Sequence, residues 1–96
     1  MITHIVNFKL KNNSAENMQA VRKRLLGMDG NIPQLRYLEV GIDELRTERS
    51  YDIVLITRFD SWADAEAYQV EPYHQEVLAF MREVIASTIA VDYESD

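Results

Sequence analysis

The sequence predicts an α+β domain whose elements follow the order β-α-β-β-α-β. Segments 2–10, 35–42, 51–59 and 87–93 have the alternating or continuous apolar pattern of strands. Segments 15–28 and 61–85 carry apolar side chains at helical spacing. This order is that of the ferredoxin-like fold, in which helices cover one face of an antiparallel four-stranded sheet. The 96 residues suffice for a single domain, residues 1–96.

The first strand alternates most regularly, and its apolar face also carries a histidine, His4. A break at residues 12–14 follows, and Ser14 is suited to cap the next helix because its hydroxyl can accept from a free backbone N–H. That helix has an apolar stripe formed by Met18, Val21, Leu25 and Met28. The turn at residues 29–31 ends it.

The third strand differs from the first because it is apolar on both faces. Ile53, Leu55 and Phe59 point one way, and Val54 and Ile56 point the other. Such a strand is usually covered on both faces, whereas the helices of this fold cover only one. We therefore expect a homodimer in which two copies pack sheet against sheet.

The second helical segment is predicted to contain a break. Ser61 is suited to cap a short helix that runs to about Gln69, and Pro72 suits the first turn of a new helix. The new helix has an inner stripe formed by Val77, Leu78, Met81, Val84 and Ile85. The last strand presents Ile89, Val91 and Tyr93 on one face.

Composition excludes several classes of function. A net charge of −6 argues against nucleic acid, since phosphate binding needs a surplus of cations. No apolar run approaches the roughly 20 residues that span a bilayer, so we expect a cytoplasmic protein that does not bind membranes. The chain has no cysteine, no Gly-rich phosphate loop and no spacing typical of a metal site. We expect no cofactor and no metal.

Two histidines and one tyrosine are the candidate catalytic residues: His74, Tyr68 and His4. A neutral imidazole can take a proton from a carbon acid, and a phenol can hold a carbonyl or enolate oxygen. If the break at Pro72 turns Tyr68 and His74 towards one cavity, the pair could support enolisation or aldol closure. The simpler interpretation is that each histidine is a hydrogen-bonded core residue.

Several segments together resemble the stress-responsive alpha/beta barrel (Dabb) family, within the dimeric alpha/beta barrel superfamily. These are HIVNFKLK at the start, IPQLRYLEVG, YDIVLITRFDS, AYQVEPYH and the closing VDY. The resemblance covers nearly the whole chain and implies a ferredoxin-like monomer and a dimer whose two sheets form a barrel. It also implies a link to stress responses.

One plant branch of that family contains cyclases similar to olivetolic acid cyclase, which close polyketides by aldol condensation without a cofactor. The resemblance places their Tyr–His pair on Tyr68 and His74, and a further pocket histidine on His4. The sequence departs from the pattern at Glu71, where a histidine is frequent, and at Leu25 or a neighbour, where the cyclases have a tyrosine.

Three functions stay open at the level of sequence. The first is a stress-response dimer that binds a small organic molecule in a pocket between sheet and helices. The second is a cofactor-free enzyme, either a cyclase-like lyase or a relative of the dimeric-barrel monooxygenases. The third is a structural dimer with no ligand. A cavity of roughly 300 Å³ or more beside the three candidate residues would favour the first two.

Overall fold

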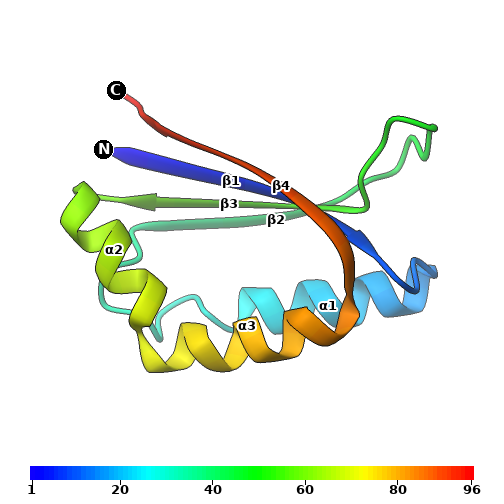
Figure 1. Ribbon diagram of the computed structural model, residues 1–96, viewed down its shortest axis with the longest axis horizontal. Coiled ribbons are helices and arrows are strands. Elements are labelled where there is room, and N and C mark those ends of the chain that lie inside the picture. The colour runs from blue at the N-terminus through cyan, green and yellow to red at the C-terminus, as the bar shows by residue number, and fades with distance from the viewer.

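The computed structural model describes residues 1–96 as one layer of strands and one layer of helices (Figure 1). In chain order the elements are β1 Ile2–Leu10, α1 Ala15–Leu26, β2 Tyr37–Ile42, β3 Ile53–Phe59, α2 Trp62–Val70, α3 Pro72–Val84 and β4 Ile85–Glu94. The strands form one antiparallel sheet in the order β2-β3-β1-β4. The predicted ferredoxin-like arrangement is confirmed, with the second helical segment divided into α2 and α3.

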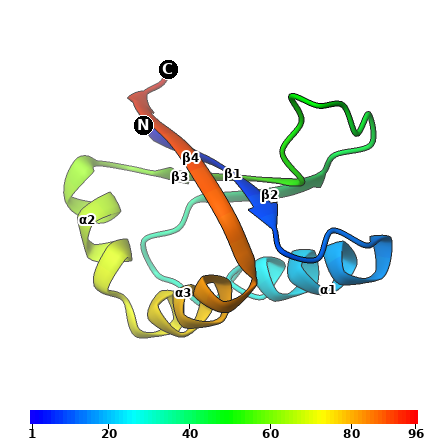
Figure 2. The same ribbon diagram turned by 45° about the vertical axis from the view of Figure 1, so that its right-hand side comes forward.

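The division between α2 and α3 lies at Glu71, as the proline predicts. Glu71 is extended, with ψ of 133°, because a residue that precedes proline is disfavoured in the helical region. Pro72 then occupies the first turn of α3, and the Glu71 carboxylate accepts from the backbone N–H groups of Tyr73 and His74 at 3.0 Å each. The two helices therefore meet at a corner, which Figure 2 shows from a second direction.

The end of α3 differs from the prediction. Ile85 was expected in the inner stripe of the helix, but it caps α3 in an extended conformation and begins β4 directly. Its N–H still donates to the Met81 carbonyl, so the chain passes from helix to strand without a loop. β4 consequently starts two residues earlier than expected, and its pairing with β1 is irregular at Lys9 and Leu10.

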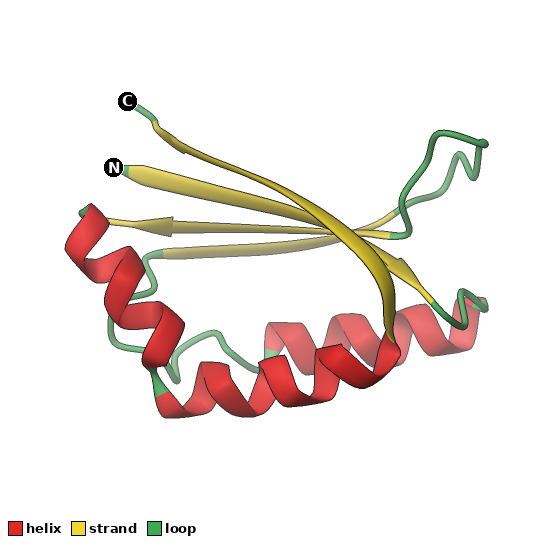
Figure 3. Cartoon of the chain, viewed as in Figure 1, coloured by secondary structure: helices red, strands yellow, loops and turns green.

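The hydrophobic core lies between the sheet and the helices (Figure 3). Alternate residues of β1 and β3 supply its floor, and the predicted stripe of α1 packs onto it together with Val77 and Met81 of α3. The predicted cap is present, since the Ser14 hydroxyl accepts from the Asn17 N–H. None of these helices has both the length and the apolar character needed to cross a membrane.

The opposite face of the sheet has no helices on it, and the loop between β2 and β3 rises on that side (Figure 1). Ile5 of β1 stands between Ile56 of β3 and Val91 of β4 in the sheet register. Val91 is 61% exposed and Ile89 is 51% exposed, although both are apolar. This surface, formed by Ile5, Val54, Ile56, Ile89, Val91 and Tyr93, is called the open face below.

Candidate functional site

A cavity of about 240 Å³ lies between the sheet and the helices, and the three candidate residues line it together. His4 comes from the sheet floor, Tyr68 from α2 and His74 from α3. Most of the remaining wall is apolar, including Leu25, Met28, Leu55, Val77 and Met81. The volume is below the roughly 300 Å³ that would favour a ligand function, so the size of the cavity alone does not decide between a ligand site and a packed core.

His74 is held in place by the corner between α2 and α3. Its ring Nδ1 lies 2.9 Å from the Tyr68 carbonyl oxygen and donates to it, because a carbonyl can only accept. This bond leaves Nε2 as the unprotonated nitrogen of the neutral ring. The side chain is buried, and burial lowers the pKa of His74, opposed by the backbone carbonyls of Tyr68 and Gln69.

Tyr68 stacks on His74, with ring centroids 3.8 Å apart and 24° between the planes. It also packs against Phe59 of the sheet at 4.8 Å. Its hydroxyl lies 3.6 Å from the Met28 sulfur, a weak acceptor to which it donates. Burial, with the nearby Glu71 carboxylate, raises the pKa of Tyr68 above its usual value, so the residue remains a neutral phenol.

His4 has a charged partner that sequence analysis did not identify. Asp92 of β4 lies directly opposite His4 of β1 in the antiparallel register. The His4 Nδ1 is hydrogen bonded to the Asp92 carboxylate. A carboxylate can only accept, so Nδ1 carries the proton and Nε2 is left without a protein partner.

The site therefore contains two histidines that each carry a proton at Nδ1 but have different surroundings. His74 is held by a neutral carbonyl in the helical layer, and His4 by a carboxylate at the sheet. Only the strand register, which joins residues 88 positions apart, brings Asp92 to His4. In the sequence, Asp92 lies within the closing VDY segment. Nothing in that segment itself indicates that Asp92 pairs with His4.

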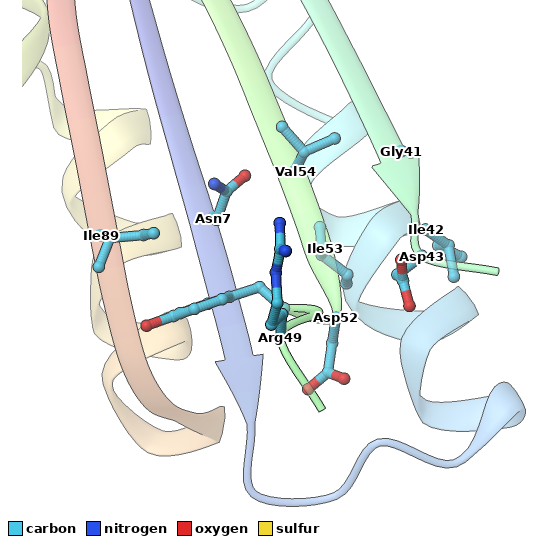
Figure 4. A pocket seen from close by; sticks show the side chains of 10 residues that line it. Asn7, Gly41, Ile42, Asp43, Arg49, Asp52, Ile53, Val54 and Ile89 are labelled. Carbon is cyan, nitrogen blue, oxygen red and sulfur yellow. The ribbon is translucent and has the colours of Figure 1, made fainter. Parts of the chain in front are cut away.

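A second hollow, of about 360 Å³, lies on the open face beside the β2–β3 loop (Figure 4). Its wall mixes apolar Val54 and Ile89 with polar Asn7, and Arg49 extends from the loop over the strands. None of the candidate catalytic residues lies in this hollow. We therefore place the candidate site in the cavity between the sheet and the helices.

A family model described as the stress responsive A/B barrel domain matches residues 2–95. The chain belongs to this family. The match confirms the resemblance inferred from the sequence segments and covers every helix and strand. No curated protein sequence matches the chain significantly.

Solved structures of similar chains agree with the ferredoxin-like fold. A dimeric protein of unknown function with a ferredoxin-like fold from Bacteroides fragilis is 27% identical, with a TM-score of 0.82 over 98% of this chain and 95% of that one. A dimeric ferredoxin-like protein of unknown function from Thermobifida fusca is 25% identical, with a TM-score of 0.84 over 98% and 90%. The hydroxynitrile lyase of Passiflora edulis is 15% identical, with a TM-score of 0.83 over 99% and 93%, a likeness of fold alone.

Proposed function

We propose that this member of the barrel-domain family binds a small organic carbonyl compound in the cavity between sheet and helices. The observation that carries the proposal is the pairing of an apolar cavity with two imidazole rings whose Nε2 atoms have no protein partner. An apolar pocket with a few convergent polar groups is the usual form of a small-molecule site. The family is described as stress responsive, and we propose that the binding serves a stress response.

We also propose that the protein is a homodimer in which the open faces of two copies pack together. The exposed Ile89 and Val91 support this, because contiguous apolar surface on a small domain commonly marks an interface. The two structures at 25% and 27% identity are each described as dimeric, which supports the same assembly. A stable interface of this kind buries about 800 Å² per subunit.

A second candidate function is cofactor-free acid–base catalysis on the bound molecule. His74 would serve as the base, since its lowered pKa keeps it neutral near pH 7. Tyr68 and His4 are the groups available to hold a substrate oxygen. Both a cyclase-like lyase and a monooxygenase-like reaction would begin with such proton removal. At about 240 Å³ the cavity is smaller than the roughly 300 Å³ that would favour these two functions by size alone. What supports them over a purely structural dimer is that the Nε2 atoms of both histidines lack a protein partner.

Thermal denaturation with monocyclic aromatic ketones, beginning with acetophenone, tests the binding function. A ligand at a hundred times its Kd stabilises the folded state by about 2.7 kcal/mol, which raises the Tm of a domain this size by about 10 °C. Ala90→Phe should abolish the shift because Ala90 lines the cavity. Ala79→Phe, on the exposed side of α3, is the matched control. Equal shifts in both variants would place binding elsewhere.

A further inference from the structure

The floor of the cavity carries a polar pair built into the sheet. His4 and Asp92 face each other across β1 and β4, and the ladder on both sides of them fixes their spacing. The His4 side chain is 17% exposed, whereas that of Asp92 is 49% exposed. The imidazole therefore lies towards the cavity and the carboxylate lies behind it, closer to solvent.

A third polar residue lies on the other side of His4, so that Asp92, His4 and Thr57 form a row across the sheet. Thr57 of β3 lies opposite His4 in the register, and its hydroxyl is fully buried without a hydrogen-bond partner. A buried hydroxyl left unsatisfied costs about 1–3 kcal/mol. This row contains an unsatisfied hydroxyl and a histidine–carboxylate pair. It is therefore polar, whereas the rest of the core is apolar.

Tyr68 is less free than His4 to contact a ligand oxygen. Its hydroxyl already donates to the Met28 sulfur, and the residue is 1% exposed. Its ring packs against Phe59 and stacks on His74. The His4 Nε2, in contrast, has no competing partner within the chain.

We propose that the His4–Asp92 pair, and not the Tyr68 hydroxyl, binds the carbonyl oxygen of the ligand while His74 faces its acidic carbon. Asp92 is a positioning residue that fixes the His4 tautomer and stabilises the protonated ring, as a carboxylate does for an imidazole in other acid–base sites. The inference rests on the proposed binding function and names its ligand class, small enolisable carbonyl compounds.

The proton transfers balance without a cofactor. His74 Nε2 takes a proton from the carbon next to the carbonyl, and the electrons of that C–H bond form the new C=C bond. The carbonyl π electrons move to the oxygen, which takes the proton from Nε2 of protonated His4. An enol, a neutral His4 and a protonated His74 result, so the total charge is unchanged. Asp92 keeps its bond to the His4 Nδ1–H throughout.

Ring ¹⁵N NMR of histidine-labelled protein tests the pair without any ligand. We expect that His4 carries a proton at Nδ1 and that Asp92→Asn shifts the His4 Nδ1 resonance while leaving the His74 resonances in place. Glu94→Gln is the matched control, since Glu94 lies on the same strand and face two residues later. A His4 that is protonated at Nε2 alone, or a His4 Nδ1 resonance that Asp92→Asn leaves unmoved, overturns the inference.

Binding of 4-nitrophenolate tests the proposed contact to the ligand oxygen, because its phenolate oxygen resembles that of an enolate. Nitrobenzene, which lacks the phenolate oxygen, is the reference compound. We expect wild type to bind the phenolate at least tenfold more tightly than nitrobenzene. Asp92→Asn should remove most of that preference and leave nitrobenzene affinity within twofold, and Glu94→Gln should change neither. Tyr68→Phe should reduce the preference less than Asp92→Asn does.

The outcomes separate this inference from the proposed function. If nitrobenzene binds but the phenolate is no tighter, or if Tyr68→Phe removes the preference and Asp92→Asn does not, the oxygen assignment is wrong and the binding cavity stands. If neither compound binds wild type, nor acetophenone, the cavity is not a ligand site and both proposals fail.

Discussion

The two faces of the sheet are built from the same strands but have different environments. On the helix-covered face, alternate residues such as Ile53 and Phe59 are almost completely buried within one chain. On the open face, Ile89 and Val91 are equally apolar and more than half exposed. The helices bury β1 and β3 on the first face, whereas nothing within the chain covers the apolar residues of the second face, which is why we propose a partner there. The candidate site lies entirely on the helix-covered face.

Because of this difference, the proposed ligand site and the proposed assembly surface can be tested separately. Side chains of β1, β3 and β4 alternate between the faces, so neighbouring residues in one strand lie on different faces. Substitutions on the helix-covered face should act on folding and binding, and those on the open face should act on association.

The largest expected effect is on folding, from the helix-covered face. Phe59→Ala should lower the free energy of unfolding by about 3–5 kcal/mol because it empties a fully buried aromatic position. Ile89→Ala, on the open face, should lower the free energy of unfolding far less when it is measured on dilute, dissociated protein. Urea denaturation at low protein concentration compares the two. Similar costs would mean that the open face is packed within the monomer.

Association should respond to the open face alone. Val91→Glu should raise the dimer dissociation constant roughly a hundredfold or more, since it places an unpaired charge in the interface of both subunits. Val70→Glu is the matched control, because Val70 is 74% exposed but lies at the end of α2. Analytical ultracentrifugation measures both. A wild-type mass near 11.2 kDa at micromolar concentration would contradict the dimer.

Thr57→Val should stabilise the apo protein by about 1 kcal/mol, because it replaces a buried hydroxyl that has no partner with a methyl group of similar size. Chemical denaturation without ligand measures the change. Thr3→Val is a useful comparison, since the Thr3 hydroxyl is bonded to the Ser95 side chain at 2.6 Å and its loss should destabilise. Destabilisation by Thr57→Val would show that the hydroxyl is hydrogen bonded in solution.

The smallest effect is a pH dependence from His74. Its folded pKa is lowered below the ordinary 6.5, so the unfolded chain binds more protons between those two values. Stability should be fully retained above about pH 6.5 and fall as the pH drops from there towards the lowered pKa. His74→Gln should flatten this part of the profile in thermal denaturation. An unchanged slope would show that His74 titrates normally in the folded protein.

Local patterns were sufficient for most of the fold. The alternation of β1 places His4 on the helix-covered face, and Pro72 marks the corner that turns Tyr68 and His74 together. Ile85 was misassigned because an apolar residue continues a helical stripe as well as it begins a strand. Asp92 was missed because its role depends on the pairing of β4 with β1, a long-range contact that no local periodicity encodes.

Methionine methyl NMR tests the central claim, that the cavity on the helix-covered face is a ligand site. Of the four methionines in the chain, Met28 and Met81 line the cavity and Met1 and Met18 do not. Titration of ¹³C-methyl-labelled protein with acetophenone should shift the Met28 and Met81 signals saturably and leave Met1 and Met18 in place. Absence of any saturable shift, or a shift confined to Met1 and Met18, would contradict the account.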